Sequence, residues 1–206
     1  MMYYRSIPLA LLTLSLGACA STPTRYYTLT PPLAGADTVA PTCCKIHIRR
    51  VAVPPGMDRA DIVTRNGSDQ VVVHSNDAWL APLADEIRSA LGSEINRHAS
   101  TITPVAPGPA VRDFGVWVNI TRFDSVYEQY VAVTADWRMQ ASTPPKSTST
   151  VCATTIRINV ADGMPALVLG YQQAIAQLAD HIELSLQNAD GDAAPGCKAG
   201  SAGSAG

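Results

Sequence analysis

Phe114-Gly-Val-Trp-Val-Asn-Ile120 and Val131-Ala-Val-Thr-Ala-Asp-Trp-Arg-Met139 carry the most regular hydrophobic pattern in the sequence. In both, apolar residues recur at every second position, which is the period of a β-strand with one buried face. A third stretch, 152–160, repeats the pattern after short breaks at 124–129 and at Pro144-Pro145. Short connections favour antiparallel neighbours, so these stretches predict three consecutive strands of one sheet.

Shorter strands are predicted on the N-terminal side of this core. The alternation over 46–53 changes phase at Arg49-Arg50, which predicts a strand with a β-bulge. Asn66-Gly67 is a strong hairpin signal between strands at 61–65 and 70–74. Residues 26–29 and 101–105 are candidates for two further short strands.

Two segments change to the helical period of 3.6 residues. The first runs over 77–97, with Asn76 or Asp77 as its N-cap and most of its charged residues facing water. The second runs over 165–187. Their predicted inward stripes are Trp79, Leu83, Ile87, Leu91 and Ile95, and Leu167, Tyr171, Ile175, Leu178, Ile182 and Leu186. The sequence therefore predicts an α+β fold, in which two amphipathic helices cover one face of a curved, mixed, largely antiparallel sheet of about five to six strands.

The N-terminus has the pattern of a bacterial lipoprotein signal. Arg5 precedes an apolar run of about 10–12 residues, well short of the ~20 that cross a bilayer, and the run ends in Leu16-Gly17-Ala18-Cys19. In that class the Cys19 thiol receives a diacylglycerol, and the chain is cut before Cys19 and acylated on the new amine. An ordinary signal-peptidase site, with Cys19 as an incidental thiol, is the alternative.

The residues after Cys19 bear on localisation and organisation. Ala20 and Ser21 follow it without an Asp, which by analogy with Gram-negative sorting favours the outer membrane, facing the periplasm. The predicted organisation is a signal peptide (1–18), a lipidated N-terminus with an extended spacer (19–42), one periplasmic α+β domain (43–188) and a Gly/Ser/Ala-rich tail (189–206). The tail has too few apolar residues to offset its chain entropy and is expected to be disordered.

Four cysteines remain in the mature chain: Cys43, Cys44, Cys152 and Cys197. An exported protein meets an oxidising compartment, and four thiols allow three complete connectivities. A bond between adjacent cysteines is geometrically awkward. We therefore expect Cys43 or Cys44 to bond to Cys152 or Cys197, and free buried thiols are an equally open alternative.

Composition and motifs argue against several function classes. The chain has 15 Lys and Arg against 17 Asp and Glu, without a basic block, so nucleic-acid binding is not expected. We find no zinc, phosphate-loop or nucleophile–base motif, and the Asp58/Asp61 carboxylates lie at a turn into a strand. The sequence therefore predicts a protein without a cofactor or metal that is not an enzyme.

Several weak motifs become informative through their order and spacing. They are Tyr26-Tyr27-Thr28-Leu29, Val51-x-Val53-Pro54, Met57-Asp58-Arg59-x-Asp61-Ile62-Val63, Trp79-x-x-Pro82-Leu83, Val116-x-Val118 followed by Phe123-Asp124, and Trp137. Over most of residues 19–188 the sequence resembles the ABC-type transport auxiliary lipoprotein family, which includes the PqiC-like lipoproteins. The resemblance implies a lipid-anchored partner of an MCE-type lipid transport system, whose other parts are an MCE-domain protein, an ABC permease and an ATPase.

Candidate contact residues follow from the sequence itself. Arg59 either forms a loop-fixing ion pair or contacts a partner. Leu167, Val168 and Leu169 belong to a segment that is apolar nearly all round, which suits docking of a partner or a second copy, and equally suits a deeply buried helix start. A homo-oligomer is therefore left open. The alternative function is a periplasmic carrier that binds a lipid or small apolar ligand in its own cavity.

Overall fold

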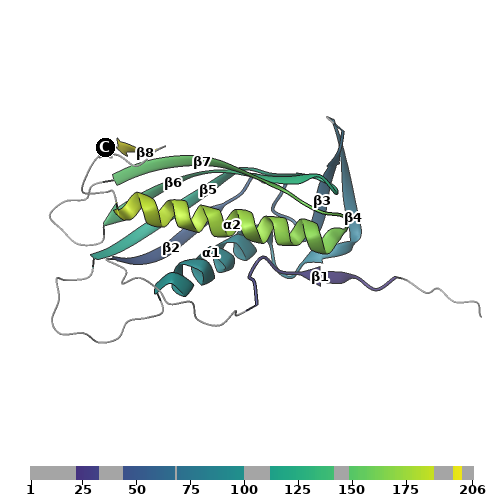
Figure 1. Ribbon diagram of the computed structural model, residues 1–206, viewed down its shortest axis with the longest axis horizontal. Helices are drawn as coiled ribbons and strands as arrows, with labels where there is room; N and C mark the ends of the chain where they lie inside the picture. Colours follow the sequence, from purple (N-terminus) through teal and green to yellow (C-terminus); the bar gives the residue numbers. More distant parts are fainter. Residues whose placement is uncertain are drawn as a thin grey trace, which may run out of the picture.

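The computed structural model describes residues 22–32, 44–67, 69–99, 112–141, 149–187 and 197–200. Within them, one mixed eight-stranded sheet carries two helices on one face (Figure 1). The sheet order is β1-β4-β3-β5-β6-β7-β8, with β2 beside β5. The predicted α+β class is confirmed, and the sheet is larger than predicted because short strands form at both ends of the described chain.

The three strands that the alternating pattern predicted form the centre of the sheet. They are β5 (Arg112–Val126), β6 (Tyr130–Ala141) and β7 (Ser149–Asn159), paired antiparallel as predicted. The register places Val118, Trp137 and Cys152 side by side, all of them buried. β5 extends six residues past Ile120, so the turn to β6 is short, and Glu128 adopts a positive φ of 59° within it.

The strands on the N-terminal side also follow the sequence pattern. β2 (Cys44–Ala52) pairs in parallel with β5, and its register shifts between Ile48 and Arg50, which confirms the predicted bulge. β3 (Asp61–Asn66) and β4 (Gln70–Trp79) form the predicted hairpin. Gly67 has φ 76° at its turn, a conformation that glycine adopts without steric cost. The candidate strand at 101–105 lies outside the described residues.

The start of the first helix was predicted wrongly. α1 spans Leu83–Ala99, whereas Trp79 ends β4 and neither Asn76 nor Asp77 caps a helix. Pro82 stands immediately before α1, and its carbonyl accepts the Glu86 amide at 3.0 Å. Proline at a helix start is already held at a helical φ. The short strand β1 (Arg25–Tyr27) pairs in parallel with the end of β4, which holds residues 77–79 in the sheet.

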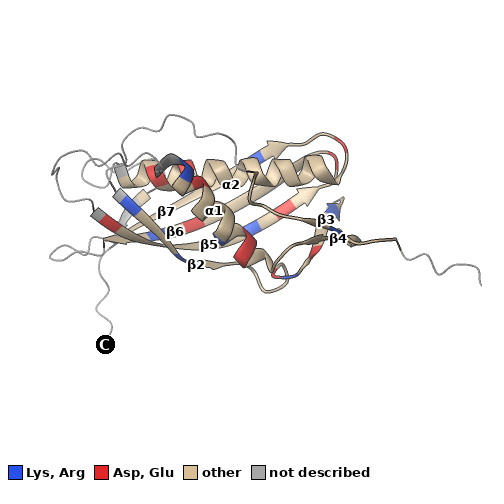
Figure 2. Ribbon diagram, turned by 90° about the horizontal axis from the view of Figure 1, so that it is seen from below, with Lys and Arg blue, Asp and Glu red and all other residues tan. Residues whose placement is uncertain are grey.

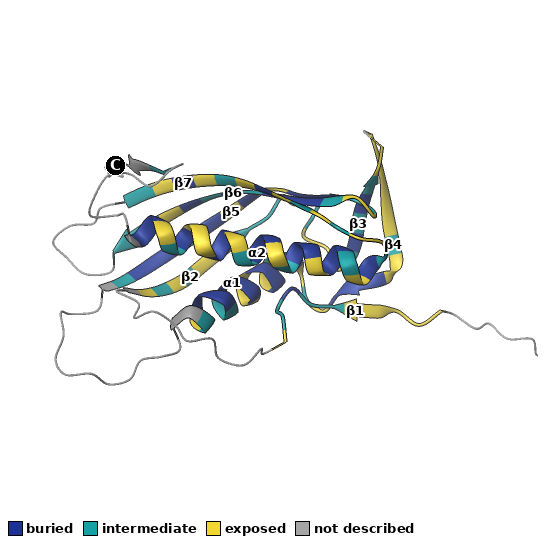
Figure 3. Cartoon of the chain, in the orientation of Figure 1, coloured by how far each residue is buried: buried dark blue, intermediate teal, exposed yellow. Residues whose placement is uncertain are grey.

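The second helix and the core agree with the predicted pattern. α2 spans Met164–Gln187, and all six residues of its predicted stripe are buried. Figure 3 shows that both helices turn their buried sides toward the sheet. Gly170 lets α2 pack closely against Val160 and against Val131 of β6, because a Cβ there would overlap the Val160 side chain and lie 3.3 Å from that of Val131.

Three aromatic rings join β4, β5 and α2. Phe123 and Tyr171 are stacked, with 4.0 Å between ring centroids, and Trp79 meets their edges at 6.3 and 6.0 Å. Complete burial raises the pKa of the Tyr171 hydroxyl above its ordinary value of 10.0, so the ring stays neutral at physiological pH. We call Trp79, Phe123 and Tyr171 the aromatic cluster.

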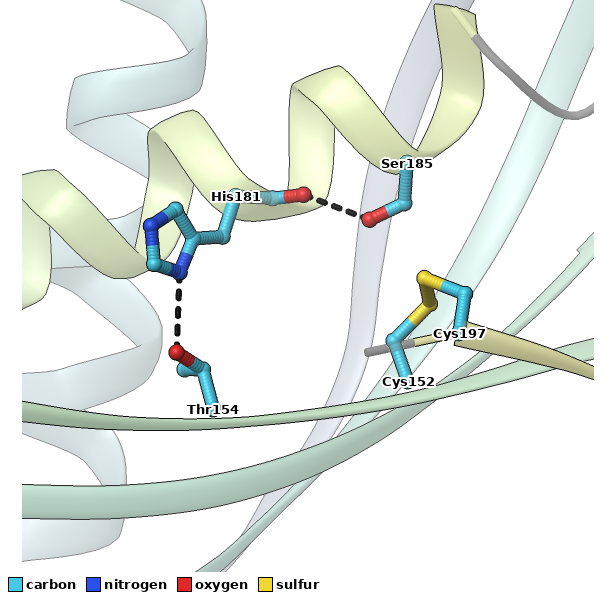
Figure 4. Close-up of a disulfide and its surroundings, with 5 residues drawn as sticks. All are labelled: Cys152, Thr154, His181, Ser185 and Cys197. Atoms are coloured by element: carbon cyan, nitrogen blue, oxygen red, sulfur yellow. Dashed lines mark hydrogen bonds between the residues drawn. A yellow bond between two sulfur atoms is a disulfide. The ribbon is translucent and has the colours of Figure 1, made fainter. Parts of the chain in front are cut away.

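The disulfide joins Cys152 to Cys197 (Figure 4). The expected bond from Cys43 or Cys44 to one of these two is therefore wrong. Cys197 begins β8 (Cys197–Gly200), which pairs antiparallel with β7 and sets Cys197 opposite Cys152. The expected disorder of the tail is wrong for 197–200, because the bond and the strand pairing fix a segment whose composition alone would not order it. Cys43 lies outside the described residues.

We expect Cys197→Ser to lower the free energy of unfolding by about 2–4 kcal/mol, because the bond constrains the unfolded chain across a separation of 45 residues. Denaturant titration with and without a thiol reductant measures this. The reductant should destabilise the wild type and leave the variant unchanged. Equal midpoints for the oxidised and reduced wild type would contradict a structural bond here.

Candidate functional site: the docked N-terminal segment

The residues that follow the candidate lipidation site are built into the fold. Cys19 lies outside the described residues, but β1 begins only six positions later, at Arg25. The backbone of β1 pairs with β4, and the Leu80 amide donates to the Tyr27 carbonyl at 2.8 Å. The chain therefore contacts the domain almost as soon as it leaves Cys19, well before the predicted spacer ends at residue 42.

Leu29 is the deepest point of this segment. Its side chain is fully buried in the core, and its amide donates to Glu86 Oε2 at 2.8 Å. The same oxygen accepts the Thr28 hydroxyl at 2.8 Å, and Gln172 Nε2 of α2 donates to the Thr28 carbonyl at 3.0 Å. A buried apolar side chain and three hydrogen bonds thus attach the segment to both helices.

Glu86 can be buried because its surroundings offset the loss of water. It lies in the first turn of α1, where the helix dipole favours a negative charge. It is 5% exposed and accepts the two donors from Thr28 and Leu29. The prediction that the charged residues of this helix mostly face water is wrong for Glu86 and for Glu94, which is 3% exposed and pairs with Arg97 at 2.9 Å.

A bidentate ion pair orients the start of the segment. Arg25 donates from Nε to Asp77 Oδ1 at 2.8 Å and from Nη2 to Asp77 Oδ2 at 3.0 Å. Asp77 is buried and Arg25 is exposed. The hydrogen bond to the Asp77 carboxylate raises the pKa of Arg25. Two effects raise the pKa of the Tyr27 hydroxyl: burial, which is the larger, and the nearby Asp77 carboxylate. Fork geometry of this kind fixes direction as well as distance. We call Arg25, Thr28, Leu29, Asp77, Glu86 and Gln172 the N-terminal clasp.

Two of the sequence motifs meet at the start of α1. Asp58 Oδ1 accepts the Ala84 amide at 3.3 Å, which places a carboxylate from the preceding loop at the helix N-terminus. Arg59 pairs with Asp61 at 2.7 Å, and both side chains are partly exposed. Asp58, Arg59 and Asp61 therefore hold the loop that leads into β3 and the start of α1.

The predicted contact residues do not form one surface. Leu167 and Val168 lie in the first turns of α2 and are buried in the core, whereas their neighbour Leu169 is 53% exposed. The interpretation of this stretch as a buried helix start holds for Leu167 and Val168, which cannot meet a partner without unpacking the core. Arg59 lies in the loop before β3, on a different element from Leu169.

Two histidines of the described residues form hydrogen bonds to threonine hydroxyls. His74 meets the Thr64 hydroxyl at 2.9 Å, and His181 meets Thr154 (Figure 4). Within the described ranges, we find no group of three His, Cys, Asp or Glu side chains that could hold a metal ion. Basic and acidic positions are interspersed along the strands in Figure 2. No helix in the described part of the chain is long and apolar enough to span a bilayer.

Sequence reasoning missed most of the clasp. It named 26–29 as a candidate strand and a family motif without a docking role, it named Asp77 only as a candidate N-cap, and it did not single out Glu86 or Gln172. One feature of the sequence could have indicated that Glu86 has a special role: it directly precedes Ile87 of the apolar stripe and lies in the first turn of the helix. Its partners were not identifiable, because Leu29 and Glu86 are separated by 57 positions.

The fold recurs in solved structures. A crystal structure described as an uncharacterised protein matches 80% of this chain and 99% of its own, with a TM-score of 0.57 and 17% identity. A DUF330 protein from Xanthomonas campestris matches 81% of this chain and 99% of its own, with a TM-score of 0.57 and 14% identity. No curated protein matches the chain.

The family of the ABC-type transport auxiliary lipoprotein component matches the sequence over residues 27–183. The matched region begins inside β1 and ends inside α2, so it includes most of the clasp, the hairpin and the aromatic cluster. The resemblance drawn from the sequence motifs is thereby confirmed: this chain belongs to the ABC-type transport auxiliary lipoprotein family.

Proposed function

We propose that this protein is an outer-membrane-anchored periplasmic lipoprotein, held by acyl chains on Cys19, that serves an ABC/MCE-type lipid transport system through protein–protein contacts. The N-terminal clasp is the observation that carries the proposal. In a member of a lipoprotein family, the segment that begins six positions after the candidate lipidation site Cys19 is docked by a buried leucine, a buried carboxylate and a bidentate ion pair.

The clasp gives the anchor a mechanical role. More than one acyl chain attaches a protein stably to a bilayer, at about 0.8 kcal/mol for each buried CH₂. A long flexible spacer would let the domain tumble above the membrane. Docking at Arg25 instead leaves six residue steps, at most about 20 Å of extended chain, between Cys19 and the sheet. The domain would then be held close to the membrane for its partners.

The proposed partners are an MCE-domain protein and the permease and ATPase of the transporter, with self-association left as a further arrangement. Leu169 is exposed and available for contact, and Arg59 is exposed as well but is already paired with Asp61. The proposed role needs no catalytic site. The carrier alternative gains no support, because buried side chains from α1, α2 and the sheet form one packed cluster in the described part of the chain.

Replacing Cys19 with serine should release the protein from the membrane fraction. We expect the wild type to float with outer-membrane vesicles and to carry acyl mass on its N-terminal peptide. After crosslinking in membranes, it should be recovered together with an MCE-domain protein or a permease. Cys43→Ser is the matched control and should still float. An N-terminus without acyl chains would contradict the anchor, and crosslinking that recovers neither protein would contradict the transport role.

A further inference from the structure

One face of the β3–β4 hairpin is apolar and exposed. Val71 and Val73 are 59% and 43% exposed, and the register places Val63 opposite Val73 on the same face. The other face of the hairpin carries Ile62 and Thr64, which are 1% and 2% exposed, and also Val72 opposite Thr64, which is 40% exposed. We call Val63, Val71 and Val73 the valine face. Valines in a strand are normally covered on at least one side, so this face suits a partner.

The charge beside the valine face is already paired. Arg65 stands opposite Val71 in the hairpin and donates from Nε to Asp124 Oδ1 at 2.8 Å. Asp124 also accepts Arg122 at 2.7 Å, and its side chain is 8% exposed. An apolar surface next to a neutralised basic group can approach a low-dielectric medium at less cost than one next to an isolated charge.

The hairpin lies at the same end of the molecule as β1, the described strand nearest to Cys19 in the sequence. Figures 1 and 2 both show β1 and the β3–β4 hairpin at the same end, and Figure 3 shows the outer strand β4 largely exposed. Two further exposed side chains lie where β1 meets the C-terminal end of β4, at the other end of that strand from Val71: Tyr26 of β1 at 65% and Leu80, just past β4, at 67%. Tyrosine combines an apolar ring with a polar hydroxyl and is enriched at membrane–water interfaces.

The short chain between Cys19 and Arg25 favours a phospholipid bilayer as the partner that covers this surface. The chain from Cys19 to Arg25 spans at most about 20 Å, so an acylated Cys19 keeps this end near the bilayer. α2 extends toward the opposite end, and its 24 residues measure about 36 Å. The apolar end is thus the one that the anchor brings to the lipid.

We propose that the valine face, together with Tyr26 and Leu80, is a membrane-contact surface that rests on the phospholipid headgroups beside the Cys19 anchor. This proposal rests on the proposed acylation of Cys19. The surface binds phospholipid bilayer, and its contacts fix which end of the sheet faces the membrane. The clasp and the valine face then act together, since the first fixes the tether to the domain and the second fixes the domain to the bilayer.

A tryptophan introduced in place of Val71 tests the contact directly. The acylated Val71→Trp protein is reconstituted into vesicles of phosphatidylethanolamine and phosphatidylglycerol, with and without bromine on the acyl chains. Native Trp79 and Trp137 are each 3% exposed and Trp117 is half-buried, and the background that they give is subtracted with the wild type. We expect brominated lipid to reduce the added fluorescence about twofold.

Leu184→Trp is the matched control. Leu184 is 51% exposed, much as Val71 is, but it lies 20 residues after the start of α2, about 30 Å along the helix axis. Its added fluorescence should be the same in both kinds of vesicle. Equal quenching at the two positions would overturn the proposal, because it would show contact without orientation.

The outcomes separate this proposal from the proposed function. A Val71→Trp protein that floats and carries acyl mass, but whose added fluorescence is not quenched, retains the anchor and overturns the membrane-contact surface. If native acylation is absent, the proposed anchor is wrong, and the membrane-contact surface is then tested separately. For this test, the Val71→Trp and Leu184→Trp variants carry serine in place of Cys43 and Cys44, so that Cys19 alone couples to a maleimide lipid. Quenching in the Val71→Trp variant alone then supports the surface, and its absence overturns it. A dimer in sedimentation that shields position 71 without lipid would assign the face to a second copy.

Discussion

Replacing Leu29 with alanine should lower the free energy of unfolding by about 2–5 kcal/mol, the usual cost of truncating a buried leucine. Leu29 is fully buried, so its truncation leaves a cavity in the core, and the hydrogen bond from its amide to Glu86 holds the backbone of the segment in place. We also expect residues 25–29 to become sensitive to protease, because the hydrogen bonds of the clasp then lack their apolar support. Denaturant titration and mass spectrometry of early cleavage products measure the two effects.

Tyr26→Ala is the control for this experiment. Tyr26 is three positions away on the same segment, but it is 65% exposed, so its truncation should change the free energy of unfolding by less than about 0.5 kcal/mol. If the two variants lose a similar free energy of unfolding, the burial of Leu29 is not what attaches the segment to the domain. A Leu29→Ala protein as stable as the wild type would show that the clasp is not docked in solution.

Replacing Trp79 with alanine should cost about 3–5 kcal/mol, because the variant loses a large buried ring from the aromatic cluster. Trp79 is 3% exposed and contacts Phe123 of β5 and Tyr171 of α2 edge-on. It is the last residue of β4, so the ring ties the hairpin to the central sheet. Hydrogen exchange should therefore rise first in β3 and β4, with the central β5–β6 pairing protected for longer.

Trp117→Ala is the matched control for the loss of a tryptophan. Trp117 lies in β5, is only half-buried, and stacks under the Arg138 guanidinium at 4.6 Å. We expect its truncation to cost less than that of Trp79 and to leave exchange in the hairpin unchanged. If the two variants lose the same stability, or if exchange rises uniformly in Trp79→Ala, the cluster does not hold the hairpin separately.

Periodicity predicted the parts of this fold whose environment is uniform along a segment. β5, β6 and β7 each have one buried face along much of their length, so alternation revealed them, and α2 has a continuous apolar stripe. The bulge in β2 appeared as a change of phase, and the hairpin turn as Asn66-Gly67. These signals are local, since each depends on residues within a few positions of one another.

The failures occurred where a distant segment changes the environment. Residues 77–79 fit a helical stripe, but β1 pairs with them across about 50 positions and holds them as strand. Glu86 has the composition of a solvent-facing helical residue, but Leu29 and Thr28 supply donors that make its burial favourable. Cys152 pairs with Cys197 because β8 lies beside β7, and four cysteines in a sequence do not show which strands are neighbours.

The sequence by itself determined the α+β class, the three central strands, the second helix and the family, because hydrophobic period and ordered motifs are recorded residue by residue. Only the packed chain shows that residues 25–29 are clasped to both helices, that Leu167 and Val168 are core, and that the valine face shares an end of the molecule with β1. The physical reason is that burial and hydrogen bonding depend on which surfaces meet, and a meeting between residues 57 positions apart is settled only when the whole chain has packed.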